Sequence, residues 1–375
     1  MTPALLDESL DALLEPVTAS SLKSLAAKLP STDRLFGFLM PGNVPGAGIH
    51  EVCAGLLAGA ALLIKSASSE PLFFANFMRT LAEVDATIAA RVAVVNFGRG
   101  DDAAMRELWA ACDGGVVAYG DDASIAALSA AAATCGARRT LVGFGSRLSG
   151  ALVVPGTSPS AAEAAADGLA RDVTLFEQRG CLSPHHVFMV GDTGEARGFA
   201  AHLARALERL ARRLPAPARL PLDAAAAIRA LRERARWRAL AQRPDCGRGH
   251  DVALWEGERL IGPPGETPGE SMSESMRWTV IYDGAAGFSA SPGYRTVFVS
   301  ALKGADEIGE RLGAAAGLVE AFALSAPPDI RVRLDAGLRL LGVSYVCEPG
   351  RMQSPPLDWA HGGGAMLELL RGAAR

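Results

Sequence analysis

The segment 177–184, which reads EQRGCLSP, contains the residue best suited to covalent chemistry, Cys181. The cysteine follows a glycine and a cationic residue, in a turn-rich stretch between two apolar ones. Backbone N–H groups and nearby positive charge lower the pKa of a thiol, and the thiolate is the nucleophilic form. A cysteine taken alone is more often a small buried apolar residue. The interpretation of Cys181 as a nucleophile therefore depends on a second segment.

That second segment, residues 41–71, reads as loop, helix, strand and loop. The loop PGNVPG at 41–46 carries the amide side chain of Asn43, and Lys65 ends a short apolar strand. A Gly, Pro and Asn cluster breaks the chain, and open α/β sheets bind nucleotides at the carboxyl ends of their strands. The simpler alternatives are an ordinary turn and a solvated lysine.

The elements that must position these residues follow a βαβ pattern. Between residues 35 and 154, apolar stretches alternate with alanine-rich ones; the predicted strands are 62–64, 92–96, 115–119 and 140–144. Such alternation is typical of a parallel sheet in an α/β protein. Two helices are expected at about 195–214 and 222–242, a surface loop or flap at 257–276, and two more strands at 278–282 and 295–302.

Composition is that of a globular protein, with 49% hydrophobic and 21% charged residues and a formal net charge of −4. This mild charge gives no electrostatic reason to expect nucleic acid or a membrane surface as a partner. No apolar run approaches the ~20 residues that span a bilayer, and residues 52–64 come nearest. A soluble cytoplasmic enzyme is predicted.

The six cysteines have no Cys-x-x-Cys spacing, so neither a zinc ribbon nor a disulfide framework is indicated. Their number and spacing suit a reducing cytoplasm. Cys246 and His250 have a metal-like spacing without a second pair, which favours a chance occurrence. No metal site is predicted.

Four ordered passages resemble the aldehyde dehydrogenase superfamily, and within it the acyl-CoA reductases of the bacterial luminescence type, also called fatty acid reductases. They are PGNVP at 41–45, residues 57–73 with Lys65, EQRGCLSP at 177–184, and GRMQSPPLDW at 350–359. The resemblance runs from about residue 35 to 363. It implies an aldehyde dehydrogenase-like α/β fold, with a Rossmann-like cofactor domain and an α/β catalytic domain. Only 40 residues precede the first passage, fewer than relatives usually carry, so the chain is expected to be N-terminally short.

The resemblance also implies roles for individual residues. Cys181 would attack the substrate carbonyl, and the Asn43 amide with the Cys181 N–H would hold the oxyanion. Lys65 would bind the ribose hydroxyls of a nicotinamide dinucleotide, and Gly120 would lie in a turn beside the nicotinamide. His361 is a candidate proton donor, although a histidine in a flexible glycine-rich tail is slightly favoured. His185 and His186 are not expected to be required bases.

Two departures from the family pattern refine the expected chemistry. Gly143 stands where hydrolytic aldehyde dehydrogenases carry a general-base glutamate, so a thioester intermediate is expected to persist rather than hydrolyse. Ser68 stands where NAD-preferring relatives often carry a glutamate, with Glu70 displaced by two positions. A small neutral residue leaves room for a 2′-phosphate, which favours NADPH over NADH, with NADH left open.

The predicted domains are a dinucleotide-binding domain at 1–172, a catalytic domain at 173–345 and a C-terminal tail at 346–375 that packs back on the active site. The predicted function is NADPH-dependent reduction of a fatty acyl thioester to an aldehyde through an acyl-cysteine intermediate. Two alternatives stay open. The same fold could reduce an acyl phosphate or act as a CoA-acylating aldehyde dehydrogenase, or the chain could be an inactive relative kept as a binding or scaffolding subunit.

The expected partners follow from the resemblance alone. They are an acyl-CoA or acyl-carrier thioester as substrate and an acyl-protein synthetase as a supplier of activated fatty acid. A homo-oligomer is compatible with the sequence. The acyl chain length and the choice between CoA and a carrier protein cannot be read from these residues.

Overall fold

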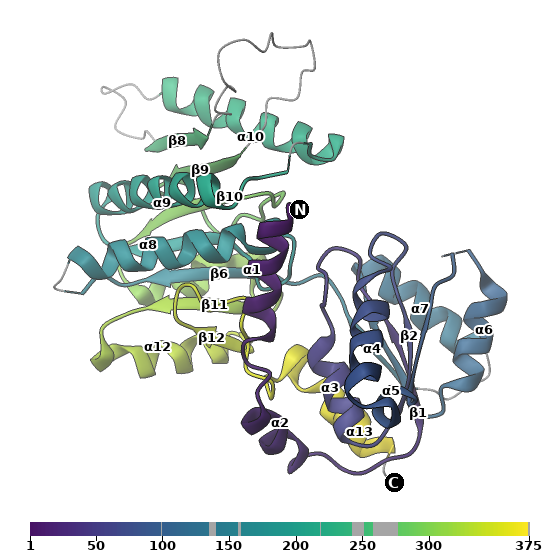
Figure 1. Cartoon of the computed structure of the whole chain (residues 1–375). Coiled ribbons are helices and arrows are strands. Elements are labelled where there is room, and N and C mark those ends of the chain that lie inside the picture. Colours follow the sequence, from purple (N-terminus) through teal and green to yellow (C-terminus); the bar gives the residue numbers. More distant parts are fainter. Residues whose placement is uncertain are drawn as a thin grey trace. The chain divides into compact units, whose positions relative to one another are not determined.

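Figure 1 shows a computed structural model of the chain, which describes residues 1–98, 100–134, 140–156, 159–217, 219–241, 251–257 and 277–373. The chain divides into two compact units. Unit 1 contains residues 1–12 and 147–354, and unit 2 contains residues 13–146 and 355–375. Each unit has its own sheet.

The sheet of unit 2 has five parallel strands in the order β3-β2-β1-β4-β5. In chain order they are β1 (Leu35–Leu39), β2 (Ala61–Lys65), β3 (Val92–Val95), β4 (Gly115–Tyr119) and β5 (Leu141–Phe144). The four strands predicted from apolar runs are confirmed to within a residue or two at each end. Because the chain leaves β1 toward β2 and later returns to its other side at β4, the strand order reverses beside β1, as in doubly wound folds.

Helices cover both faces of this sheet because successive side chains of a strand point to opposite faces. Phe36 and Phe38 of β1 pack in one apolar cluster, whereas Leu35 and Leu39 pack in another with Trp109. The helices of unit 2 are α2 (Ala19–Ala26), α3 (Ile49–Leu57), α4 (Phe73–Val84), α5 (Ala86–Ala89), α6 (Asp102–Ala111), α7 (Asp122–Thr134) and α13 (Ala365–Ala373), with a 3₁₀ turn, η5, at His361–Gly363.

The sheet of unit 1 has seven strands in the order β12-β11-β6-β7-β10-β9-β8. They are β6 (Leu148–Val153), β7 (Pro184–Val190), β8 (Val252–Gly257), β9 (Trp278–Asp283), β10 (Thr296–Leu302), β11 (Val319–Ser325) and β12 (Tyr345–Cys347). All the pairs are parallel except the edge pair of β8 and β9. The two strands predicted at 278–282 and 295–302 are confirmed as β9 and β10.

The helices of unit 1 cover its sheet, with α8 and α9 packed against each other (Figure 1). They are most of α1 (Pro3–Leu14), then α8 (Pro159–Thr174), η1 (Leu175–Gln178), α9 (Thr193–Arg213), α10 (Leu222–Leu240), η3 (Ala305–Glu307), α11 (Ile308–Leu312), η4 (Gly313–Ala315) and α12 (Pro328–Leu340). The helices predicted at about 195–214 and 222–242 correspond to α9 and α10. The sheet and helices together confirm the predicted α/β class.

The bounds of the units differ from those of the predicted domains. Residues 147–172 belong to unit 1, because β6 pairs with β7 and β11 and α8 packs on α9. The predicted tail at 346–375 is divided at residue 354, because α13 packs on β4 and β5 of unit 2. The predicted loop at 257–276 lies, after Gly257, outside the described residues, and so do Cys246 and His250.

Within the described ranges, no helix combines the length and apolarity needed to cross a bilayer. The same residues contain no group of three or more His, Cys, Asp or Glu side chains arranged to hold a metal ion.

Candidate active site

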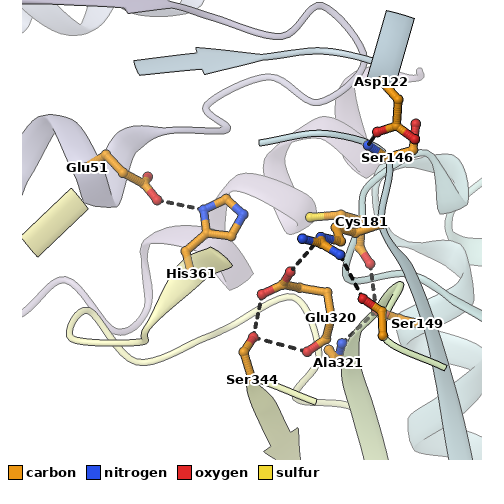
Figure 2. Close-up of polar contacts among 11 residues, drawn as sticks. Glu51, Asp122, Ser146, Ser149, Cys181, Glu320, Ala321, Ser344 and His361 are labelled. Carbon is orange, nitrogen blue, oxygen red and sulfur yellow. Dashed lines mark hydrogen bonds and ion pairs between the residues drawn. The ribbon is translucent and has the colours of Figure 1, made fainter. Parts of the chain in front are cut away.

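Cys181 lies in unit 1, in the turn between η1 and β7, and its side chain is half-buried. Its carbonyl oxygen accepts a hydrogen bond from Ser149 Oγ at 2.6 Å, and Ser149 Oγ in turn accepts the N–H of Ala321 at 3.1 Å (Figure 2). Ser149 on β6 and Ala321 on β11 are buried in neighbouring strands. The backbone of the cysteine is therefore tied to the centre of the sheet.

Three successive residues just before Cys181 have left-handed backbone conformations. Phe176, Glu177 and Gln178 have φ angles of 52°, 55° and 57°. None is glycine, and such a conformation costs an L-residue roughly 1–2 kcal/mol. Strain of this kind persists only where surrounding interactions over-determine it, and it is typical of functional sites.

A buried ion pair supplies part of that support. Arg295 Nη2 and Nε lie 3.0 and 3.2 Å from the two carboxylate oxygens of Glu177, and Arg295 Nη1 donates to the carbonyl of Leu214 at 2.8 Å. The two side chains are 1% and 3% exposed. Burial raises the pKa of Glu177 and lowers the pKa of Arg295, and the attraction between the two charges opposes both shifts. Removing either partner would leave the other charge buried and uncompensated.

The side chain of Gln178 also stabilises the left-handed backbone at 176–178. Its Nε2 donates to the carbonyls of Pro184 and Thr296, each at 2.7 Å, and its Oε1 accepts the N–H of Thr296 at 2.7 Å. Gln178 is 2% exposed. It joins the start of β7 to the start of β10 across the turn that carries Cys181.

The passage 350–353 also contacts the turn that carries Cys181. Gln353 Nε2 lies 3.3 Å from the Oγ of Ser183, two residues after the cysteine. Asp172, at the end of α8, accepts the N–H groups of Gly350 at 2.6 Å and Met352 at 3.0 Å. Burial raises the pKa of Asp172 to about 7, against these hydrogen bonds. The sequence indicated this passage only through its resemblance, since 170 residues separate Gln353 from Ser183.

Glu320 is a buried carboxylate near this turn that sequence reasoning missed. It is 3% exposed at the start of β11, one residue before Ala321. Its carboxylate accepts a hydrogen bond from Ser344 Oγ (Figure 2). Arg147 Nε lies 3.7 Å from its other oxygen. The signal was present in the sequence, because a glutamate in the otherwise apolar strand VEAFALS is expensive to bury without partners.

Asn43 lies in unit 2, in the exposed loop between β1 and α3. This loop approaches the loop that follows β2: Ser69 Oγ donates to the carbonyl of Gly42 at 3.3 Å. A Cβ at Gly42 would lie 2.0 Å from Ser69 Oγ, so this close approach requires glycine. The loop carrying Asn43 is thus held next to the loop that carries Ser68.

Lys65 is the last residue of β2, and its Nζ lies 4.9 Å from the ring centroid of Phe97. Beside it, the Oγ of Ser66 is buried and has no hydrogen-bond partner among the described protein groups. Ser68 is exposed in the following turn. Glu70 is differently engaged, since its Oε1 accepts the N–H of Phe73 at 3.0 Å at the start of α4.

Gly120 follows β4, and its N–H donates to the carbonyl of Phe144 at the end of β5. Because β2, β1 and β4 are parallel neighbours, the residues that follow them lie at one edge of the sheet, where the strand order reverses. Lys65 ends β2, and Asn43 and Gly120 follow β1 and β4. Open α/β sheets bind their ligands at this edge.

Gly143 lies inside β5, where a Cβ would be 2.5 Å from Cγ2 of Ile125. A side chain at this position would require Ile125 to move. The position therefore has no space for a water-activating carboxylate, in addition to lacking one in the sequence.

His361 does not lie in a free tail, so that slightly favoured interpretation is wrong. Its ring lies parallel to Phe144, with the centroids 4.1 Å apart, and stacks on Trp359 at 4.5 Å. Its Nδ1 is 2.7 Å from Oε1 of Glu51 on α3 (Figure 2). Glu51 is a second residue that sequence reasoning missed, because 310 positions separate it from its partner.

His185 and His186 both lie in the buried strand β7. Each accepts a backbone N–H at Nδ1, from Ser291 at 2.9 Å and from Ser289 at 3.0 Å respectively. Burial lowers the pKa of His185 to about 4 and that of His186 to about 3. Neutral rings that serve as acceptors stabilise the segment before β10, in keeping with the expectation that neither is a required base.

Among the predicted site residues, Cys181 belongs to unit 1, and Asn43, Lys65, Ser68, Gly120 and His361 belong to unit 2.

Comparison with known protein families identifies a match over most of the chain. The profile of the family described as "Acyl-CoA reductase (LuxC)" matches residues 33–256 and 265–372.

Two similar curated proteins carry related names. A long-chain acyl-protein thioester reductase 2 of Photobacterium leiognathi is 26% identical over 157 residues, which cover 41% of this chain and 32% of that protein. A long-chain acyl-protein thioester reductase of Aliivibrio fischeri is 26% identical over 179 residues, covering 47% of this chain and 36% of that protein. The matched stretches thus span about a third of the length of these relatives.

Solved structures show the same fold at lower identity. A succinic semialdehyde dehydrogenase from Streptococcus pyogenes, in complex with NADP⁺, matches with a TM-score of 0.62 and 14% identity, over 90% of this chain and 72% of that one. The NAD⁺ complex of an aldehyde dehydrogenase from Bacillus cereus matches with a TM-score of 0.62 and 14% identity, over 92% of this chain and 68% of that one. The fold is aldehyde dehydrogenase-like.

Proposed function

The chain belongs to the acyl-CoA reductase (LuxC) family, and from that premise we propose that it reduces a fatty acyl thioester to an aldehyde through an acyl group carried on Cys181. The main observation behind this proposal is that several buried interactions hold the backbone of the turn that contains Cys181. Three left-handed residues, a buried bidentate ion pair and the Ser149 hydrogen bond all fix the backbone that presents the thiol. A merely structural cysteine would not require a turn of this cost.

In the first half of the proposed reaction, the Cys181 thiolate attacks the carbonyl of the acyl donor. A tetrahedral oxyanion forms and collapses, the donor thiol leaves, and the acyl group stays on sulfur. The Cys181 N–H and the side-chain amide of Asn43 would donate hydrogen bonds to this oxyanion. The absence of space for a carboxylate at Gly143 supports an intermediate that waits for reduction rather than hydrolysis.

The residues at the carboxyl edge of the unit 2 sheet fit a nicotinamide dinucleotide. Lys65 and the unpartnered buried Oγ of Ser66 offer a cation and a hydroxyl for ribose and phosphate oxygens. Glu70 is engaged at the start of α4 and Ser68 is small and exposed, which supports NADPH over NADH because no carboxylate stands at position 68 to repel a 2′-phosphate. When bound, this cofactor supplies the hydride for the second half of the reaction.

In that second half, the acyl carbon on Cys181 gains a hydride, the new carbon–sulfur bond breaks, and the aldehyde leaves. His361 is the proposed proton donor, and the proton would pass to the Cys181 sulfur as that sulfur leaves; Cys181 would give the proton up to the released donor thiolate before its next attack. Asn43 and the Cys181 N–H would again hold the oxyanion. The aldehyde, oxidised cofactor and released donor thiol balance the thioester, reduced cofactor and one proton.

The names of the relatives support a long-chain acyl group, carried on CoA or on a protein. A protein-bound acyl donor would come from an acyl-activating enzyme, and an acyl-protein synthetase acting beside this reductase, in the cytoplasm, is the partner we propose.

The proposal is tested by turnover of a long-chain acyl-CoA with NADPH, following cofactor absorbance and identifying the aldehyde by mass spectrometry. Wild type should form aldehyde, Cys181→Ala should not, and Cys53→Ala should behave like wild type. Cys53 is a matched control because burial raises the pKa of its thiol to about 12. Aldehyde formation by folded Cys181→Ala would contradict the proposal, and folded wild type without turnover would favour a scaffolding relative.

A further inference from the structure

Glu51 and His361 form a pair that joins the C-terminal passage of unit 2 to helix α3. His361 Nδ1 lies 2.7 Å from Glu51 Oε1, and the side chains are 14% and 8% exposed (Figure 2). Glu51 lies in the third position of α3, a largely apolar helix that packs on the sheet. Burying a carboxylate here is expensive unless a charged or hydrogen-bonding partner compensates it.

The protonation state of Glu51 determines whether Nδ1 of His361 donates or accepts the hydrogen bond between the two side chains. Burial alone would raise the pKa of Glu51, but attraction to His361 and the hydrogen bond from it outweigh that effect and lower the pKa to about 2. The carboxylate is therefore ionised and can only accept. A hydrogen bond at 2.7 Å then requires a proton on Nδ1 of His361.

Neighbouring aromatic rings fix the plane of the His361 imidazole, and the Glu51 carboxylate fixes the rotation of the ring within that plane. The ring lies 1° from the plane of Phe144 and 23° from that of Trp359, with Tyr119 stacked at 6.0 Å. Phe144 and Tyr119 end β5 and β4, so the imidazole lies at the carboxyl edge of the sheet. A ring held in plane and in rotation presents its other nitrogen in one direction.

We propose that Glu51 is a positioning residue, which holds the Nδ1–H of His361 so that the proton exchanged in the reduction is carried on Nε2. This inference rests on the proposed function for the reaction step, but not for the hydrogen bond itself. The pattern is that of a histidine whose tautomer is set by a carboxylate on its second nitrogen. No sequence spacing links the two residues.

Other titratable groups face this pair. His50 precedes Glu51 on α3, Cys53 follows two residues after it, and Tyr119 stacks near the imidazole. Burial lowers the pKa of His50 and raises that of Cys53, so both are neutral near pH 7. Glu51 is thus the ionised neighbour among these facing groups.

The hydrogen bond is tested without substrate or cofactor by nitrogen NMR of the histidine rings in the full chain, with His361→Gln used to assign the signal. In wild type, Nδ1 of His361 should be protonated across pH 6 to 8. In Glu51→Gln the protonated-ring signal should disappear at a lower pH, by about 1–3 units as expected on removing a neighbouring opposite charge. An Nε2–H tautomer in wild type, with Nδ1 bare, would overturn the proposal.

The catalytic consequence is tested by the pH dependence of the reduction step, started from enzyme acylated in advance. The alkaline limb should move to lower pH by about 1 unit or more in Glu51→Gln, and Glu51→Asp should return it toward wild type. Glu368→Gln is the matched control, since that carboxylate is exposed on α13 and pairs with Arg371.

Failure of this inference is distinguishable from failure of the proposed function. An unmoved alkaline limb in folded, acylated Glu51→Gln would reject Glu51 as a positioning residue while leaving Cys181 as the nucleophile. If no variant becomes acylated, the proposed function fails, and the NMR result alone decides whether Glu51 sets the tautomer.

Discussion

The segment before Cys181 and the loop that carries Asn43 are built in opposite ways. The first is held by buried interactions to residues more than 100 positions away, through Glu177, Gln178 and Arg295. The second presents the exposed side chain of Asn43 beside the buried Val44, and the contacts that hold it come from neighbouring loops, among them the hydrogen bond from Ser69 Oγ to the carbonyl of Gly42. The turn that carries Cys181, the proposed nucleophile, is thus positioned by distant parts of unit 1, whereas the loop that carries the proposed oxyanion donor is positioned by neighbouring loops. Substitutions in the first should therefore reduce stability, and those in the second should reduce activity.

The largest effect is expected where the nucleophile segment is most deeply supported. Arg295→Met should lower the free energy of unfolding by about 3–5 kcal/mol, because it leaves Glu177 charged and buried. Arg209→Met is the matched control, since its pair with Asp167 is more than half exposed, and it should cost about 1 kcal/mol or less. Urea unfolding measures both. Equal small losses would remove the contrast between the two regions.

The converse holds for Asn43→Ala. Loss of one oxyanion donor should raise the barrier by about 3 kcal/mol, or slow turnover about 100-fold. The free energy of unfolding should stay within about 0.5 kcal/mol of wild type, as for surface substitutions. Asn76→Ala, an exposed amide on α4, should change neither quantity. A loss of stability in Asn43→Ala, with unchanged turnover by the folded protein, would contradict the proposal that Asn43 acts on the reaction and not on the fold.

Acid should test the buried histidines of β7, the strand that follows the Cys181 turn. His185 and His186 have folded-state pKa values of about 4 and about 3, below the unfolded value of about 6.5. Their contribution to stability is therefore present above pH 6.5 and is lost as pH falls toward 4, by up to about 1.4 kcal/mol per pH unit for each histidine. The contribution of Glu51 in unit 2 should persist until the pH falls below 4.5.

Unfolding curves between pH 7.5 and 4.5 measure this slope. His186→Asn should flatten it, whereas His202→Gln, at an exposed ring on α9, should not. An unchanged slope in His186→Asn would show that β7 does not bear the acid sensitivity.

The smallest effect is expected at the rim of the proposed cofactor site. Ser68→Glu should lower the preference for NADPH over NADH severalfold, because a carboxylate at that exposed position would repel a 2′-phosphate and could accept from ribose hydroxyls. The ratio of kcat/KM for the two cofactors measures it. An unchanged ratio would remove position 68 from the site.

The sequence predicted what depends on local pattern. Apolar runs of three to five residues placed β2, β3, β4 and β5 to within a residue at each end, and the parallel sheet then put Lys65 and Gly120 at one edge. The cysteine turn was also identifiable, because a glycine and a proline flank it. The spacing of apolar residues and the positions of glycine and proline are local properties of the sequence, so they can be interpreted without knowledge of the tertiary fold.

The support of these residues could not be predicted. From the sequence alone Glu177 is an ordinary polar residue, because its partner Arg295 lies 118 positions later and contacts it only in the folded chain. A left-handed conformation at Phe176 has no sequence signature, because only tertiary contacts impose it on a non-glycine residue. The packing of His361 is also invisible to a local pattern, because its partners, Glu51 and Phe144, are distant in sequence.

The most direct test of the central claim is intact mass spectrometry of the protein after incubation with a long-chain acyl-CoA, followed by a chase with NADPH. We predict that wild type and Cys53→Ala gain the mass of one acyl group, lose it during the chase, and release aldehyde. Cys181→Ala should gain none. An adduct that persists in folded Cys181→Ala, or the absence of any adduct on folded wild type, would contradict the assignment of Cys181 as the acyl carrier.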